Sequence, residues 1–157
     1  MRKAISIIMG SKSDLETVNQ AIALLKEFRI SFELKVLSAH RQPERLVKYI
    51  KQASENGTKI FIAAAGKAAA LPGVIAAHTS LPVIGVPIET KSLKGLDSLL
   101  SIVQMPAGVP VGCMAIGKSG AKNAALFALQ ILALNDQKIA KKLISYKRRL
   151  SNPVKRK

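Results

Sequence analysis

The sequence has little of what disulfide frameworks, cysteine-based metal sites and aromatic binding platforms require. It contains one cysteine, Cys113, and no tryptophan, and aromatic residues make up 4% of the 157 residues. A lone cysteine forms neither an internal disulfide nor a cysteine-based zinc site, so we expect a small buried side chain there and no metal. No apolar run approaches the ~20 residues of a membrane-spanning helix, and the N-terminus lacks a signal-length apolar region. We therefore expect no membrane partner and a cytoplasmic location.

Acidic residues are also scarce, and none follows Asp136. The chain holds 25 Lys and Arg against 9 Asp and Glu, a formal net charge of +16, and nine of the basic residues lie beyond Asp136. A basic tail can bind nucleic acid or an anionic membrane. No aromatic platform interleaves these residues and no nucleic-acid motif is present, so we favour a solvated surface over a nucleic-acid partner. We expect one domain over residues 1–150 and a basic, frayed tail over 151–157.

Short aliphatic runs alternate with helical patterns along the chain. Strands are expected at 3–9, 31–37, 58–65, 81–87 and 110–117, and helices at 14–28, 43–57, 121–134 and 136–150. This alternation predicts right-handed βαβ units and an α/β fold with a parallel sheet. The stretch 95–112 has the turn chemistry of a loop, so no core element is expected there. In such sheets, ligands bind at the carboxyl ends of the strands.

The first strand ends in the loop GSKSDLE. Gly10 permits a tight turn, and Ser13 with Glu16 has the spacing of a capping box, which predicts a helix start. The free backbone N–H groups of a helix start, with the hydroxyls of Ser11 and Ser13, suit a phosphate. Asp14 would repel an anion and is expected to accept hydrogen bonds from sugar hydroxyls instead. Taken alone, the sequence of this loop favours an ordinary helix cap.

The second strand ends in SAHRQPE, where Ser38, His40 and Arg41 precede Pro43. Proline suits the first turn of a helix. Arginine offers a fork of donors that matches phosphate, and histidine titrates near neutral pH, as a proton shuttle must. A lone histidine is more often structural, and its place beside an arginine at a strand end makes a functional role an equal alternative. We interpret the second histidine, His78, as structural.

The third strand ends in AAAGKAAALPG. Gly66 and its small neighbours would let a ligand approach the backbone closely, and tight packing of a helix on the sheet is the competing interpretation. Pro72 and Gly73 mark a helix start. From these residues alone, we expect a phosphate-bearing small molecule and one acid–base histidine.

Five motifs together resemble a known family. MGSKSD, SAHRQP, AALPG, GLDSLLSIVQMPAGVPVGCMAIG and GAKNAALFALQIL occur in this order over about residues 3–145. They resemble the phosphoribosylaminoimidazole carboxylase catalytic subunits of class I, whose bacterial form is the 5-(carboxyamino)imidazole ribonucleotide mutase of de novo purine biosynthesis. The resemblance implies a three-layer α/β/α sandwich with a flavodoxin-like sheet and a C-terminal helix. It also implies a homo-octamer with active sites between subunits, a small ribonucleotide substrate and no cofactor.

The resemblance also implies a reaction and a role for each candidate residue. The carboxyl group leaves the exocyclic nitrogen as CO2, is held in the closed site, and is added to carbon 4 of the imidazole. The segment 105–110 would cover the site, and the backbone near Gly66 would line the CO2 pocket. The implied roles are acid–base catalysis by His40, phosphate binding by Ser11, Ser38 and Arg41 with help from Ser13, and binding of the ribose hydroxyls by Asp14.

Two positions depart from the family pattern, in which this loop reads GGAAHLPG. Lys67 stands where the family has its second glycine, and Ala70 where it has histidine. If the backbone at Lys67 has positive φ, the lysine is strained by ~1 kcal/mol or more. Two alternatives to the mutase stay open: direct carboxylation of aminoimidazole ribonucleotide with CO2, and a non-catalytic, degenerate or RNA-associated homologue. Retention of His40 argues against degeneracy.

Overall fold

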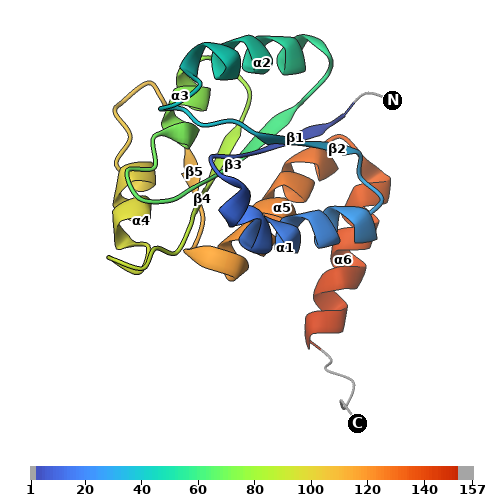
Figure 1. Ribbon diagram of the computed structural model, residues 1–157. Helices are drawn as coiled ribbons and strands as arrows, with labels where there is room; N and C mark the ends of the chain where they lie inside the picture. The colour runs from blue at the N-terminus through green and yellow to red at the C-terminus, as the bar shows by residue number, and fades with distance from the viewer. Residues whose placement is uncertain (1–2, 152–157) are drawn as a thin grey trace.

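Five short strands form a parallel sheet with the spatial order β2-β1-β3-β4-β5 (Figure 1). The computed structural model describes residues 3–151 of the chain. The strands are β1 (Ile5–Met9), β2 (Phe32–Val36), β3 (Ile60–Ala65), β4 (Val83–Pro87) and β5 (Gly112–Cys113). The helices are α1 (Leu15–Glu27), α2 (Pro43–Glu55), α3 (Leu71–Ala77), α4 (Leu96–Val103), α5 (Gly117–Ala133) and α6 (Gln137–Ser151), and a 3-10 turn, η1 (Lys12–Asp14), precedes α1.

The strand order is that of flavodoxin-like folds, and helices cover both faces of the sheet. Helices α1, α5 and α6 pack on one face, where Leu25 and Leu129 lie in the core. Helices α2 and α3 cover the other face with Leu46 and Ile75, and α4 adds Ile102 to the same cluster. The predicted three-layer sandwich with a C-terminal helix is therefore confirmed.

The burial of each strand follows from its place in the sheet. All residues of β1 and β3 are buried, because each has a strand on both sides and helices on both faces. Strand β2 lies at the edge, and its residues are half-buried, with Val36 exposed. Phe32 and Leu34 pack against the core cluster on one face, whereas Glu33 and Lys35 contact Tyr49 on α2.

The prediction of a loop over 95–112 is wrong for its first half, which forms α4. Ser98 and Ile102 are fully buried on this helix, and the Ser98 hydroxyl donates a 2.8 Å hydrogen bond to the Ile88 carbonyl at the end of β4. Gly95 precedes the helix with a φ of 89°, a conformation that glycine adopts without strain. The glycine, aspartate and serine residues that suggested a loop therefore mark the beginning of a short helix.

The end of α2 agrees with the prediction, whereas the length of β5 differs from it. The predicted end of α2 at Gly57 is confirmed: Gly57 has a φ of 96°, and the Thr58 N–H donates to the Ala53 carbonyl at 3.0 Å. This pairing is a Schellman motif. The fifth predicted strand, 110–117, is shorter than expected, because only the two residues of β5 pair with β4 and α5 already begins at Gly117.

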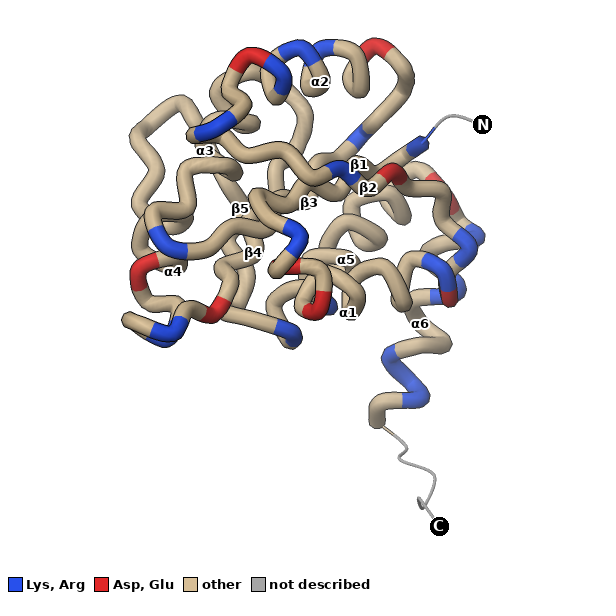
Figure 2. Tube along the Cα trace, viewed as in Figure 1, with Lys and Arg blue, Asp and Glu red and all other residues tan. Residues whose placement is uncertain are grey.

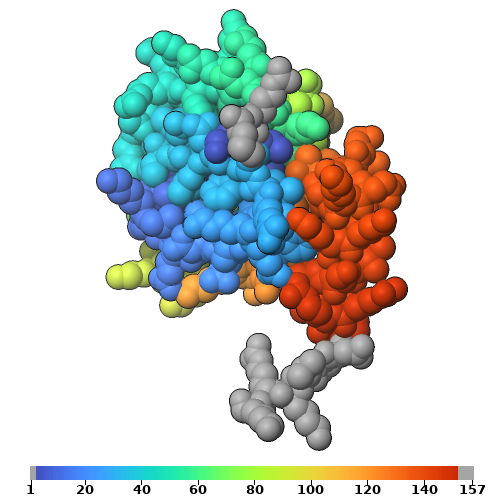
Figure 3. Space-filling model, turned by 90° about the vertical axis from the view of Figure 1, so that its right-hand side faces the viewer, coloured from blue at the N-terminus to red at the C-terminus, as the bar shows by residue number. Residues whose placement is uncertain are grey.

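The excess of basic residues is concentrated on α6, which carries no acidic residue (Figure 2). Its last turns stand out from the body of the molecule (Figures 1 and 3). Arg149 pairs with Glu27 at 2.6 Å, and the Lys142 ammonium donates to the Phe28 carbonyl, so the basic helix is tied to the end of α1. Residues 152–157 of the predicted tail lie outside the described residues. Within residues 3–151, no helix is long and apolar enough to cross a membrane.

Candidate active site

Three loops meet at the carboxyl edge of the sheet, where the strand order reverses between β1 and β3. They follow β1 (residues 10–14), β2 (38–41) and β3 (66–70), and β1 lies hydrogen-bonded between the other two strands. The Gly10 N–H donates to the Ala64 carbonyl at 3.2 Å, and the Leu37 N–H donates to the Met9 carbonyl at 3.0 Å. The pairing of the strands therefore continues into the loops and fixes their relative positions. This switch point is where ligands bind in open α/β sheets.

The loop after β1 is closed by a capping box that begins two residues earlier than predicted. The pair is Ser11 and Asp14, not Ser13 and Glu16. The Ser11 hydroxyl oxygen accepts hydrogen bonds from the Ser13 N–H (3.3 Å) and the Ser13 hydroxyl (2.8 Å), and Asp14 accepts one from the Ser11 N–H (3.2 Å). Glu16 is instead paired with Lys118 at the start of α5. The correction arises because the 3-10 turn η1 precedes α1, and the box caps that turn.

Asp14 is a buried carboxylate without a basic partner. Its side chain is 8% exposed, and it accepts a second hydrogen bond from the Ser13 hydroxyl at 3.2 Å. Within residues 3–151, Asp14 forms no ion pair. Burial raises the pKa of Asp14, and the hydrogen bonds from Ser13 and Ser11 only partly oppose the rise. The fold thus holds a negative charge in a position that hydroxyl donors of a ligand could stabilise.

The loop after β2 is joined to the loop after β1 through Arg41. The Arg41 guanidinium donates from Nη2 to the Gly10 carbonyl at 3.2 Å, and its backbone N–H donates to the Ser38 hydroxyl at 3.2 Å. His40 lies between these residues, is exposed, and has no hydrogen bond within the described part of the chain. His78 differs: it ends α3, and its Nδ1 lies 2.8 Å from the Val74 carbonyl. The chain therefore has one histidine with a local backbone partner and one that is free for a ligand.

The loop after β3 contains the strained position. Lys67 has a φ of 59°, in the left-handed region, so the condition for strain stated above is met. Gly66 does not have positive φ, and a Cβ added there would lie 3.5 Å from the Ile88 Cβ, an ordinary contact. The fold itself therefore does not require glycine at 66, and close approach of a ligand there remains a prediction.

The segment after α4 packs on the start of α3, beside the loop after β3. The Met105 Cε lies 3.1 Å from where a Cβ on Gly73 would be, so a side chain at 73 would displace Met105. Sequence reasoning gave Gly73 only as a helix start, because this contact joins residues far apart in the chain. This contact holds Met105 beside the start of α3, which follows the loop after β3.

The candidate residues are presented on an open surface. Ser13, His40, Arg41 and Lys67 are exposed. Two cavities lie elsewhere, one between β2 and α2 and the other between the end of α1 and α6. No group of three or more His, Cys, Asp or Glu residues with metal-site geometry occurs within residues 3–151. To exclude water from these residues, another part of the chain or a second molecule would have to cover them.

A flavodoxin-like sheet with serine, arginine and histidine loops at its switch point defines a class of α/β proteins suited to phosphorylated ligands. The family model described as AIR carboxylase matches residues 4–152. The chain belongs to this family. It is 53% identical over 150 residues to the N5-carboxyaminoimidazole ribonucleotide mutase of Saccharolobus solfataricus, covering 96% of this chain and 94% of the relative. It is 54% identical over 143 residues to the mutase of Bacillus subtilis, covering 91% of this chain and 88% of the relative.

Solved structures agree with the family assignment. The crystal structure of Treponema denticola PurE superposes with a TM-score of 0.85 at 30% identity, covering 94% of this chain and 90% of that one. The structure of Treponema denticola PurE2-S38D gives a TM-score of 0.87 at 30% identity, covering 96% and 92%. The fold expected from the resemblance is thus shared with these structures over almost the whole chain.

The buried charge of Asp14 predicts a gain in stability for Asp14→Asn. Because the folded-state pKa is raised above 3.8, the folded state binds more protons than the unfolded state just above that pH. Wild-type stability should therefore fall, relative to the variant, as the pH rises from 3.8 through the folded pKa, and the difference should stay constant above it. Urea unfolding of both proteins at pH 4 and pH 7, at one protein concentration, measures this difference.

The matched control is Asp136→Asn. The exposed Asp136 carboxylate accepts hydrogen bonds from the Lys138 and Ile139 N–H groups at the start of α6. A charge at a helix N-terminus is stabilising, so this change should leave stability unchanged or lower it by up to ~1 kcal/mol. If Asp14→Asn loses as much stability at pH 7 as Asp136→Asn does, the predicted gain in stability is contradicted.

Proposed function

We propose that this protein converts 5-(carboxyamino)imidazole ribonucleotide to 4-carboxy-5-aminoimidazole ribonucleotide, as an isomerase of de novo purine biosynthesis. The observation that carries the proposal is the exposed, unpartnered His40 beside Arg41, at the switch point of a chain whose curated relatives are named as this mutase. The proposal includes a cytoplasmic location, because a charged ribonucleotide does not cross a membrane unaided.

Different residues of the loops would bind the phosphate and the ribose of the substrate. Ser11, Ser38 and Arg41 would bind the phosphate, aided by the backbone N–H groups near Ser13. The Arg41 fork is already oriented by its bond to the Gly10 carbonyl, which lowers the entropy lost when it binds an anion. Asp14 would accept hydrogen bonds from the ribose hydroxyls. Those bonds would replace the water that burial has removed from its carboxylate, and each is worth roughly 1.5–3 kcal/mol.

The reaction needs one proton to move and no group from outside the substrate. The bond between the exocyclic nitrogen and the carboxyl carbon breaks, releasing CO2, and carbon 4 then attacks CO2 to form the new carbon–carbon bond. Carbon 4 loses its proton, and the nitrogen gains one. His40 would carry this proton, a role typically worth 10²–10⁴-fold in rate. The backbone near Gly66 would line the CO2 pocket.

An open site would lose CO2 to solvent, which favours assembly of several copies around it. We propose a homo-octamer in which the segment 105–110 and a neighbouring copy cover the loops. Helix α4 supports this, because Leu96, Leu100 and Val103 form an apolar stripe at helical spacing and are 51%, 51% and 49% exposed. Apolar stripes of this kind mark protein–protein contact surfaces.

Direct carboxylation of aminoimidazole ribonucleotide is the second candidate, because the same loops could bind that nucleotide and CO2. Presenting each substrate to the purified protein separates the two. Turnover of the carboxyamino compound without added bicarbonate supports the mutase. Turnover only of aminoimidazole ribonucleotide with CO2 supports the carboxylase.

The central test is His40→Ala, with His78→Ala as the matched control. We expect His40→Ala to lower turnover at least ~100-fold while nucleotide affinity changes little, because the side chain would move a proton rather than hold the phosphate. His78→Ala should keep wild-type turnover. Steady-state kinetics with the carboxyamino substrate, together with calorimetric titration of the nucleotide, measure both quantities. Wild-type turnover in His40→Ala would refute the assignment.

Lys67→Gly is expected to keep substrate affinity within about threefold, under ~1 kcal/mol, and to give equal or higher turnover. Its exposed side chain should point to solvent, and glycine removes the strain of a φ of 59°. Arg29→Gly is the control, because Arg29 has the same φ at the end of α1, away from the loops. Both variants should gain stability in thermal unfolding. A tenfold loss of kcat/KM in Lys67→Gly alone would show that the ammonium contacts the substrate.

The assembly is tested by light scattering. Eight copies of the 16.8 kDa chain give about 134 kDa. Leu100→Asp should dissociate the particle and abolish turnover, because it places a charge on the α4 stripe. Ser101→Asp introduces the same charge on the adjacent, exposed position of α4 and should leave the particle intact. A fully active monomer would contradict the proposed assembly.

A further inference from the structure

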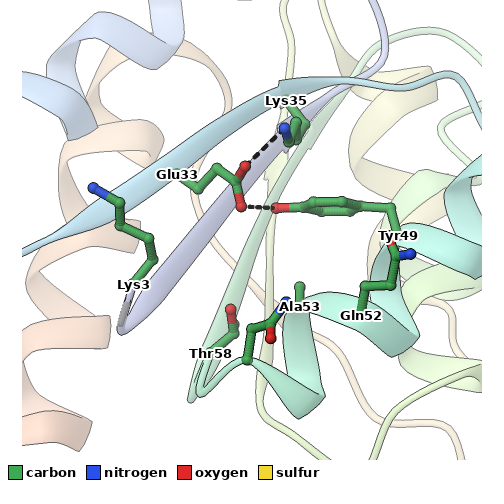
Figure 4. A pocket seen from close by; sticks show the side chains of 8 residues that line it. Lys3, Glu33, Lys35, Tyr49, Gln52, Ala53 and Thr58 are labelled. Carbon is green, nitrogen blue, oxygen red and sulfur yellow. Dashed lines mark hydrogen bonds and ion pairs between the residues drawn. The ribbon is translucent and has the colours of Figure 1, made fainter. Parts of the chain in front are cut away.

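A cavity of about 330 Å³ lies between β2 and α2, away from the candidate active site (Figure 4). It opens toward the amino ends of the strands: Lys3 precedes β1 and Thr58 precedes β3, whereas the catalytic loops follow the carboxyl ends. Its size is near the lower end of the ~300–1,000 Å³ of small-molecule sites. The lining residues come from four segments, and they are Lys3, Glu33, Lys35, Tyr49, Gln52, Ala53, Asn56 and Thr58.

One wall of the cavity is a hydrogen-bonded chain whose acceptors are already occupied. Glu33 accepts the Lys35 ammonium at 2.7 Å on one oxygen and the Tyr49 hydroxyl at 3.0 Å on the other (Figure 4). The Tyr49 hydroxyl also lies 2.7 Å from the hydroxyl of the fully buried Ser6 in β1. Lys35, the Tyr49 hydroxyl and the charge of Lys3 lower the pKa of Glu33. Burial is the main reason that the pKa of Tyr49 is raised to about 12. At neutral pH this wall is therefore fixed, with Glu33 charged and Tyr49 protonated.

The remaining polar groups of the cavity are free. Lys3, Gln52, Asn56 and Thr58 make no side-chain hydrogen bond within residues 3–151, and Lys3 forms no ion pair there. Thr58 is 6% exposed, and no enclosed side-chain oxygen within residues 3–151 lacks a partner, so the Thr58 hydroxyl is accessible from the cavity. This side of the cavity thus offers an ammonium group, two amides and one hydroxyl to a ligand.

The balance of charge favours an anion. Lys35 neutralises Glu33, the one carboxylate of the lining, so the charge of Lys3 is in excess. The end of α2 contributes a partial negative charge, but its last carbonyls already accept the N–H groups of Asn56, Gly57 and Thr58. The side-chain amides and the Thr58 hydroxyl match hydroxyl groups, which both donate and accept.

We propose that this cavity is a binding site for a small hydroxylated anion, a sugar acid or a sugar phosphate, separate from the catalytic loops. The acidic group binds at Lys3, beside the Lys35–Glu33 pair, and the hydroxyls of the ligand bind at Gln52, Asn56 and Thr58. The Tyr49 ring forms an apolar wall, over which the Lys35 ammonium lies 5.5 Å from the ring centroid.

The chain supplies its own reporter for this site. It has two tyrosines, Tyr49 and Tyr146, and no tryptophan. Tyr146→Phe in the full-length protein leaves Tyr49 as the only strong intrinsic fluorophore, and the Tyr146 ring contact with Phe28 is kept by phenylalanine. The fluorescence emission of Tyr49 in this variant is measured as gluconate or glycerol 3-phosphate is added at constant ionic strength. Chloride and glycerol serve as blanks.

We expect a saturable change in Tyr49 emission with at least one of the two anions and none with the blanks. A response to gluconate indicates a carboxylate ligand, and a response to glycerol 3-phosphate a phosphorylated one. Lys3→Gln and Thr58→Val should each weaken binding at least about threefold. Lys59→Gln, an exposed lysine beside the cavity but outside its lining, should change it by less than about 1.5-fold.

Arg41→Ala, which removes the proposed phosphate contact of the active site, should leave this titration unchanged. The proposal is overturned if neither anion gives saturable binding, if Lys59→Gln weakens binding as much as Lys3→Gln, or if Arg41→Ala abolishes the signal. The last result would mean that Tyr49 senses binding at the catalytic loops instead.

Discussion

The position of β1 between β2 and β3 is the constraint from which the candidate site follows. Because all three strands are parallel, their carboxyl ends meet at one edge, and backbone hydrogen bonds carry the alignment into the loops. The bond from Arg41 to the Gly10 carbonyl adds a side-chain link between two loops that are 31 residues apart. Residues of three separate loops are thereby brought together into one surface, the candidate site. Their chemistry depends on the register of buried aliphatic strands that carry no functional group.

Two local penalties coincide with this surface. Asp14 is a desolvated carboxylate with hydrogen bonds but no cationic partner among residues 3–151, and Lys67 has a left-handed backbone. Neither is needed for the sheet to form, since the surrounding strands are fully buried without them. Conflicts between local preference and overall fold are expected at functional sites. Lys67 differs from Asp14, because strain at a lysine gives no evident advantage and its side chain is exposed.

The sequence predicts the central part of the fold well because central parallel strands are continuous aliphatic runs. Prediction from the sequence fails where glycine and serine are compatible both with a turn and with the start of a helix. In α4, Gly95 and Ser98 look like turn residues, but Ser98 is buried against β4. In the loop after β1, two serines fit a capping box, and only the 3-10 turn decides that Ser11 is the cap.

Within the candidate site, the sequence identifies residue types but not their contacts. Asp14, His40 and Arg41 could be chosen from their place after predicted strands. The raised pKa of Asp14 and the Arg41–Gly10 bond depend on packing between distant segments. The cavity beneath α2 has the same origin, because Glu33 and Tyr49 are 16 residues apart and meet only when α2 folds back over the edge strand.

The apolar stripe of α4 has a consequence for how the molecule responds to salt. Each copy carries a formal charge of +16, so copies that approach one another repel, and the repulsion grows with every copy added. Contact through leucine and valine side chains gains nothing from low ionic strength, whereas the repulsion is screened over a Debye length of about 8 Å at physiological salt. In the proposed assembly, association through this stripe would therefore strengthen as salt is added, the opposite of an interface built on ion pairs. The ionic strength around the protein would then affect its folding stability too, because subunit contacts stabilise only the folded state.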